Sequence, residues 1–176
     1  MSALLVCLGI HFSGYGESLF IYDREHANQW WRFASASFVH YDLYHLLSNL
    51  LVFAAVAAVL ESSTSTTMVL AVIIGTAVLT VPSLHFLLPE YRTFAGISCI
   101  SYAIFGYLLM HESRGHVPSV LLVGLLLGLY ELTVVLGGAE IIGSSAQKPV
   151  WQLHLIALLL GVVFCFGRRY LERHKI

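Results

Sequence analysis

Long apolar segments separated by short polar turns dominate this chain. A helix that crosses a bilayer needs about 20 mostly apolar residues. Segments that meet this requirement cover residues 43–60, 67–88, 94–110, 117–136 and 149–167. A shorter apolar stretch covers residues 3–12; no Lys or Arg precedes it and no small-residue cleavage site follows it, so we interpret it as a short first helix rather than as a signal peptide. The pattern predicts an all-α, polytopic membrane protein, a six-transmembrane-helix bundle forming one domain over residues 1–176.

Composition agrees with a membrane protein and argues against several other classes. Of the 176 residues, 58% are hydrophobic and 11% are charged, against roughly 25% charged residues in an average soluble domain. The formal net charge is −1, and Lys and Arg form no run before the last nine residues, so we expect no nucleic-acid partner. Cys7, Cys99 and Cys165 lie in apolar stretches without a C-x-x-C pair, which indicates neither a disulfide framework nor a zinc knuckle.

The positive charges bear on how the helices are oriented. If the helices alternate in direction, one side of the membrane holds Arg114 and the cluster after the last apolar segment, and the other side holds Arg24, Arg32, Arg92 and Lys148. The cluster consists of Arg168, Arg169, Arg173 and Lys175. Its position favours a cytoplasmic C-terminus. The second, fourth and sixth helices are then expected to begin at the outer face.

Four polar residues lie near the starts of those helices. They are His45 and Asn49, Ser98, and His154. Polar groups in hydrocarbon are costly unless they are paired, so such residues are candidates for function. Gly106, Ala157 and Gly161 would let the fourth and sixth helices approach closely and bring Ser98 to His154.

Spacing alone leaves the role of these residues open. A neutral imidazole can activate a serine hydroxyl as a nucleophile, and His45 and Asn49, which share a helix face at i, i+4, can donate to an oxyanion. The alternative is interhelical hydrogen bonding that only holds the bundle together. We expect no bound metal, because His40 and His45 are five residues apart and do not share a helix face.

Three stretches of the chain carry aromatic, basic, serine and glycine residues at characteristic spacings. Trp31-Arg32, Phe38-Val39-His40, His45 and Asn49 look like W-R-x(5)-F/L-x-H-x(4)-H-x(3)-N. Residues 96–107, GISCISYAIFGY, resemble the serine-bearing G-x-S-G-x-x-Y-A-x-x-G-Y helix, and His154 with Gly161 resembles the H-x(6)-G helix. This ordered set is more specific than any single motif, and through it the chain resembles the rhomboid family of intramembrane serine proteases.

The resemblance implies a role for each matching residue. Ser98 would be the nucleophile and His154 the general base, while His45, Asn49 and the Ser98 backbone N–H would form the oxyanion hole. Tyr102 would stack on the His154 ring, and Gly96 belongs to the serine motif. His40 and Arg32 would support the first extracytoplasmic loop. The resemblance implies no cofactor, transmembrane protein substrates within the lipid bilayer, and a bacterial inner-membrane location with the site toward the extracytoplasmic side.

Within this family the chain looks most like the rhombosortase branch, which is associated with C-terminal Gly-Gly tails of exported proteins. The resemblance rests on the short frame, Tyr22-Asp23-Arg24 ahead of Trp30-Trp31-Arg32, Glu131, and Ile141-Ile142-Gly143. Glu131 is the only carboxylate well inside a predicted span. It is expected either to make a structural hydrogen bond between helices or to line the substrate cavity.

Three positions depart from the family pattern. Cys99 replaces the second glycine of G-x-S-G, Ala157 replaces a common glycine, and Leu153 stands where a small residue is usual. Bulk at Cys99 is expected to crowd the oxyanion or the approach of the last helix. An inactive relative that binds membrane clients without cutting them is therefore the main alternative, and a six-helix transporter is a more distant one.

Overall fold

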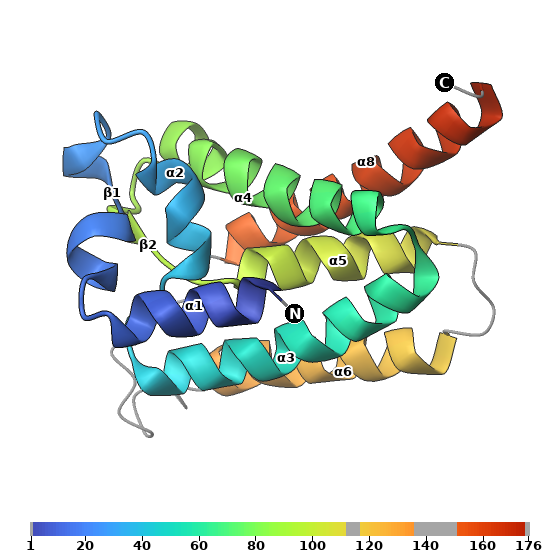
Figure 1. Ribbon diagram of the computed structural model, residues 1–176, viewed down its shortest axis with the longest axis horizontal. Coiled ribbons are helices and arrows are strands. Elements are labelled where there is room, and N and C mark those ends of the chain that lie inside the picture. The colour runs from blue at the N-terminus through green and yellow to red at the C-terminus, as the bar shows by residue number, and fades with distance from the viewer. Residues whose placement is uncertain (1, 112–116, 136–150, 175–176) are drawn as a thin grey trace.

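The computed structural model describes residues 2–111, 117–135 and 151–174 as a helical protein with one small strand pair (Figure 1). The helices are α1 (Ser2–Phe12), α2 (Arg32–Ser35), α3 (Leu43–Ser63), α4 (Thr66–Leu87), α5 (Ser98–Met110), α6 (Val117–Val135) and α8 (Trp151–His174). The strands are β1 (Tyr22–Asp23) and β2 (Thr93–Phe94), and short helical turns cover Gly16–Phe20, Arg24–His26 and Ala36–Phe38.

Helix α5 runs through the middle of the bundle and packs against α3, α4, α6 and α8 (Figure 1). Helices α3, α5 and α8 begin at the same end of the bundle, beside α2 and the strand pair. The second, fourth and sixth predicted helices, which correspond to α3, α5 and α8, therefore begin on the same side, as the alternating helix directions predicted.

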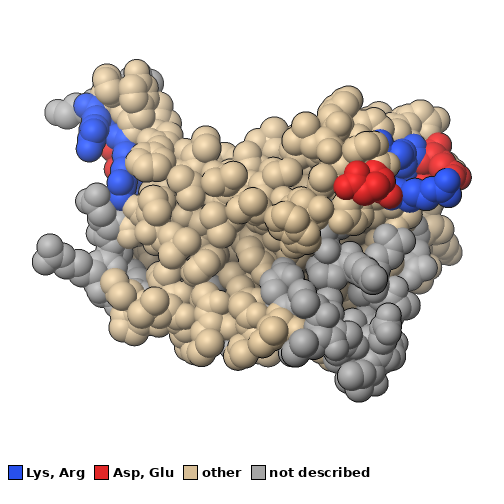
Figure 2. Space-filling view, turned by 180° about the vertical axis from the view of Figure 1, so that it is seen from behind, with Lys and Arg blue, Asp and Glu red and all other residues tan. Residues whose placement is uncertain are grey.

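The described helices have the apolar surface of a membrane protein. α3, α4 and α8 are long and apolar enough to cross a bilayer, whereas α1 and α5 are shorter apolar helices and α6 has a shorter apolar stretch. On α8, Leu155, Leu159 and Val163 are at least half exposed at a spacing of four residues. In the face seen in Figure 2, charged side chains gather at the two ends of the molecule, and the described surface between them carries none. The count of six spans stays a prediction.

The starts of α3 and α4 follow local sequence signals. The Asp42 carboxylate accepts from the His45 backbone N–H at 2.7 Å and caps α3, and the Ser65 hydroxyl accepts from the Met68 N–H at 3.4 Å and caps α4. Such side-chain caps satisfy backbone donors that the first helical turn leaves unpaired. The predicted spans 43–60 and 67–88 therefore agree closely with α3 and α4.

The predicted span 94–110 starts too early. β2 pairs antiparallel with β1, Tyr22 opposite Phe94 and Asp23 opposite Thr93, and the chain enters the helix only at Ser98. The 13-residue α5 is about 20 Å long, about 10 Å less than a bilayer's hydrocarbon core. A site at its N-terminus can therefore lie below the membrane surface. The last predicted span, 149–167, ends too early, because α8 continues to His174.

The segment Tyr22-Asp23-Arg24 ties the first loop to the end of α4. The Tyr22 hydroxyl and His85 Nδ1 are hydrogen-bonded at 2.7 Å. The Arg24 guanidinium donates to the carbonyl oxygens of Leu84 and His85 in the last turn of α4, and to those of Leu88 and Tyr91 just beyond it. These bonds position β2, which leads directly to Gly96 and Ser98.

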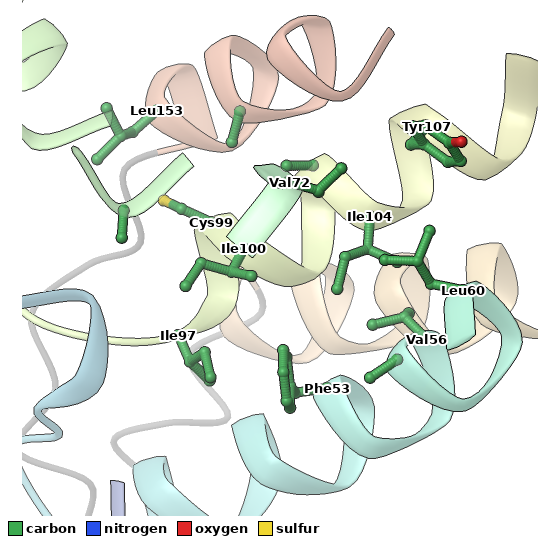
Figure 3. Close-up of a cluster of buried hydrophobic side chains, with 14 of the residues drawn as sticks. Phe53, Val56, Leu60, Val72, Ile97, Cys99, Ile100, Ile104, Tyr107 and Leu153 are labelled. Carbon is green, nitrogen blue, oxygen red and sulfur yellow. The ribbon is translucent and has the colours of Figure 1, made fainter. Parts of the chain in front are cut away.

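A continuous apolar core surrounds α5 (Figure 3). It joins side chains from α3, α4, α5 and α8, among them Phe53, Val56, Leu60, Val72, Ile100, Ile104, Tyr107 and Leu153. Within the described part, the core holds α5 in place from several sides, so the residue at its start has a defined position.

Candidate active site

Ser98 and His154 meet near the starts of α5 and α8. Ser98 is the first residue of α5, and His154 lies one turn into α8. The Ser98 Oγ and the His154 Nε2 are 3.0 Å apart, within hydrogen-bonding distance, and both residues are buried, with 8% and 6% of their surface exposed. In this arrangement the imidazole can accept the hydroxyl proton.

Small residues allow this approach, as their spacing predicted. A Cβ atom on Gly161 would overlap the backbone carbonyl of Ala103, and one on Gly106 would overlap the carbonyl of Leu158. Ala157, which has no exposed surface, lies between His154 and Gly161 on α8. The backbones of α5 and α8 therefore touch, and this contact brings Ser98 to His154.

Tyr102 lies against the imidazole. Its ring and the His154 ring are stacked, with centroids 4.3 Å apart and planes inclined by 12°. Because Tyr102 is one turn after Ser98 on α5, the helix that carries the hydroxyl also restricts the histidine ring to one orientation.

His45 and Gly96 border the same space. Gly96 has φ = 135°, a backbone conformation that favours glycine, and a Cβ built there would lie 3.2 Å from the His45 Nε2 and 3.7 Å from the Ser98 Oγ. Asn49 is 4% exposed, and its Nδ2 donates to the His45 carbonyl at 2.8 Å, which leaves the second amide hydrogen for another acceptor. The structure thus brings His45 to Ser98 and holds Asn49 one turn further along α3.

His40 and Arg32 support the segments around this space. Burial lowers the pKa of His40 to about 3, so its ring is neutral, and its Nε2 accepts from the Ile97 backbone N–H at 3.4 Å. The Arg32 guanidinium donates to the Gln29 side chain at 2.6 Å and to the carbonyls of Ile21 and Ser18 at 2.7 and 2.6 Å. His40 therefore anchors the backbone just before Ser98, and Arg32 closes the first loop on itself.

Three supporting contacts were not anticipated from the sequence. The Tyr41 ring stacks on His45, with centroids 5.7 Å apart and planes at 17°. Asp42 caps α3 beneath His45. The Tyr91 hydroxyl donates to Gln152 at 3.2 Å and joins the α4–α5 connection to the first turn of α8. Of these residues, only Asp42 could have been identified from the sequence, because an Asp directly before an apolar segment is a typical helix cap.

The departures from the motif pattern fit inside the core. Cys99 and Leu153, two of the core side chains labelled in Figure 3, have no exposed surface, and the Ser98 Oγ still lies 3.0 Å from the His154 Nε2. The expected crowding of the α8 approach by Cys99 is not seen.

Glu131 lies on α6, but its side chain falls outside the part that the structure describes. The stretch Ile141-Ile142-Gly143 also lies outside it. Across residues 2–111, 117–135 and 151–174, no three His, Cys, Asp or Glu side chains come together as a metal site.

Comparison with known proteins places the chain in a family. The rhomboid domain matches residues 27–170. The chain is 26% identical to the rhomboid protease GlpG of Yersinia enterocolitica over 94% of its own length, and 27% identical to the rhomboid protease GlpG of Yersinia pestis over 78%. It spans 61% and 48% of the length of these two relatives. Because the domain match covers most of the chain and the helices are apolar, the protein is an integral membrane protein that belongs to the rhomboid family.

Proposed function

We propose that the protein is an intramembrane serine endopeptidase that cleaves membrane-anchored protein substrates. The observation that supports this most is the 3.0 Å contact between the Ser98 Oγ and the His154 Nε2 in a buried, tightly packed position. A pair that only joined two helices would not need His45 and the glycine Gly96 beside the hydroxyl. This arrangement fits a nucleophile beside a general base, with a second histidine close to the hydroxyl.

The proposed reaction uses only side chains and backbone of this chain. His154 takes the proton from Ser98 as the Oγ attacks the scissile carbonyl carbon, and it returns the proton to the leaving amine as the peptide bond breaks. Water then attacks the acyl-enzyme with His154 again as base. His45, Asn49 and the Ser98 backbone N–H would donate to the oxyanion, and neither metal nor cofactor takes part in this scheme.

Covalent labelling tests the proposal directly. A serine-reactive fluorophosphonate should label the purified protein, and peptide mass spectrometry should place the adduct on Ser98. Labelling is expected to fail in the His154→Ala variant, because an unactivated serine hydroxyl is a poor nucleophile. A folded parent protein that takes no label, and that binds membrane clients without cutting them, would favour the inactive alternative that Cys99 raises.

Removal of the oxyanion donors should lower turnover more than substrate binding. We expect Asn49→Ala and His45→Ala each to reduce kcat by about 10²–10³-fold with little change in KM, because such donors act mainly on charge that develops in the transition state. Michaelis kinetics on a reporter substrate measure both constants.

Ser48→Ala is the matched control. Ser48 lies on the same turn of α3 and its hydroxyl donates to the His45 carbonyl at 3.2 Å, so this variant perturbs the helix without removing a proposed donor. A large rise in KM at unchanged kcat in Asn49→Ala would instead assign that residue to substrate recognition.

For the substrate class we propose exported proteins with a C-terminal Gly-Gly motif, an apolar helix and a basic tail, cleaved on the extracytoplasmic side of the bacterial inner membrane. The support is the resemblance to the rhombosortase branch. One segment that carries this resemblance, Tyr22-Asp23-Arg24, contains β1, which pairs with β2 beside the site. Two reporters that differ only in the Gly-Gly pair separate this class from general membrane substrates. Equal cleavage of both would reject it.

Glu131 offers a test of the substrate cavity. Glu131→Gln keeps the shape and most hydrogen bonding of the side chain but removes its charge. If Glu131 lines the cavity and orients water or the substrate backbone, turnover should fall at least about tenfold with unchanged thermal stability. Normal turnover in an equally stable protein contradicts the cavity role, and a lower unfolding temperature with normal turnover indicates a structural hydrogen bond.

A further inference from the structure

Two buried histidine nitrogens beside the candidate active site have no hydrogen-bond partner among the described residues. They are the Nδ1 atoms of His40, which precedes α3, and of His45, in the first turn of α3. The two rings are close, with centroids 5.0 Å apart and planes inclined by 65°. A buried polar atom costs free energy unless it is paired, so each nitrogen is expected to have a partner within reach.

The hydrogen on the His40 ring lies on Nδ1. Burial lowers the pKa of His40 to about 3, so the ring is neutral and carries a single N–H. Its Nε2 accepts from the Ile97 backbone N–H at 3.4 Å and therefore has no hydrogen of its own. Because the bond made by one ring nitrogen sets the state of the other, His40 carries a buried Nδ1–H donor.

His45 has the complementary arrangement if it acts as an oxyanion donor. Its Nε2 lies on the side of the nucleophile, since a Cβ atom built on Gly96 would be 3.2 Å from this nitrogen and 3.7 Å from the Ser98 Oγ. To donate to an oxyanion there, a neutral ring must carry its hydrogen on Nε2, which leaves Nδ1 as an acceptor. The other tautomer would turn an acceptor toward the negative oxygen.

We propose that His40 is a positioning residue that fixes the tautomer of His45: the His40 Nδ1–H donates to the His45 Nδ1 and so keeps the hydrogen of His45 on Nε2. The two atoms meet after a small ring rotation or through one buried water, and both paths use the same donor and acceptor. This inference rests on the proposed role of His45, and it gives the His40 ring a second task besides holding the Ile97 backbone.

His40→Gln and His40→Asn separate these two tasks. The amide of Gln lies as far from the backbone as Nε2 does, so its oxygen can still accept from the Ile97 N–H. The amide of Asn lies at the distance of Nδ1, so its nitrogen can still donate to His45. Gln therefore keeps the backbone anchor and loses the donor, whereas Asn keeps the donor and loses the anchor.

Solid-state NMR of the nitrogen-15 histidine-labelled protein in lipid bilayers reads the tautomers without any turnover. In the parent protein, His40 should carry its hydrogen on Nδ1 and His45 on Nε2, and each signal is assigned by its loss when that histidine is replaced. In His40→Gln, the His45 ring should populate both tautomers, because its Nδ1 no longer has a donor. In His40→Asn, the Nε2–H form should persist.

Kinetics on a reporter substrate give a second readout. His40→Gln should lower kcat by about five- to tenfold with unchanged KM, which is the factor that one neutral hydrogen bond contributes. His40→Asn should restore kcat to near the parent value, although it should unfold at a lower temperature because the Ile97 N–H loses its acceptor. If His40→Asn does not fold, the NMR comparison of the parent with His40→Gln still decides.

Two outcomes would overturn the proposal. One is an unchanged His45 tautomer in His40→Gln, which would show that His40 has no influence on that ring. The other is the reverse order of the variants, with normal kcat in His40→Gln and a loss in a folded His40→Asn, which would limit His40 to anchoring Ile97. A parent protein that takes no fluorophosphonate label but shows the expected tautomers and their change in His40→Gln would support the histidine pair and reject the protease instead.

Discussion

Replacing Ser98 with alanine should reduce cleavage of a membrane-anchored reporter by at least about 10³-fold, because the reaction loses its nucleophile. The protein should remain folded, since the change removes one hydroxyl from the first residue of α5 and leaves the contact of α5 with α8 intact. The measurements are cleavage rate in proteoliposomes and thermal unfolding in detergent.

Ser101→Ala provides the control for this prediction. Ser101 lies three residues further along α5, is 1% exposed, and its Oγ has no hydrogen-bond partner among the described residues. Loss of an unsatisfied buried hydroxyl should leave stability unchanged or slightly raised, and cleavage should continue. If Ser98→Ala cuts the reporter as fast as Ser101→Ala, Ser98 is not the nucleophile.

The helical fold could be predicted in large part because apolar length is a strong signal. The spans 43–60 and 67–88 agree with α3 and α4, whose starts carry the capping residues Asp42 and Ser65. The span that begins at residue 94 was wrong at its start, because an apolar residue such as Phe94 suits a strand as well as a helix. Its pairing with Tyr22 depends on a contact 72 residues away in sequence that periodicity does not reveal.

Less of the candidate site could be predicted. Small residues on α5 and α8 indicated that the helices touch, and the approach of Ser98 to His154 follows from that contact. The bond from Tyr91 to Gln152 could not be inferred, because it joins two elements 61 residues apart in sequence. The stack of Tyr41 on His45 could not be inferred either, because Tyr41 lies before the start of α3, where helical spacing does not apply. The side chain of Glu131 lies outside the described part, so its role stays a prediction.

Replacing Gly161 with alanine should disable the site without changing any residue that touches the substrate. The added Cβ would overlap the Ala103 carbonyl and would lie 2.8 Å from the Tyr107 backbone nitrogen. Because backbone atoms cannot move aside as a flexible side chain can, α8 must shift away from α5, and overpacking of this kind costs about 1–3 kcal/mol. A shift of about 1 Å between Ser98 and His154 is enough to lower turnover by about 10²-fold. We therefore expect a lower unfolding temperature together with lower kcat.

Gly167→Ala separates this effect from the general consequence of adding a methyl group to α8. A Cβ at Gly167 would meet nothing within 4 Å, so the alanine should keep normal turnover and, through its higher helix propensity, add up to about 1 kcal/mol of stability. Fluorophosphonate labelling then reports on the geometry of the pair itself, since it needs an activated Ser98 but no substrate cavity of defined length. Slow labelling of Gly161→Ala beside normal labelling of Gly167→Ala would show that the close contact of α5 and α8 maintains the reactive distance. Equal labelling of both would mean that the bundle absorbs the methyl group elsewhere and that Ser98 and His154 are held together by their own contacts, chiefly the stack of His154 on Tyr102.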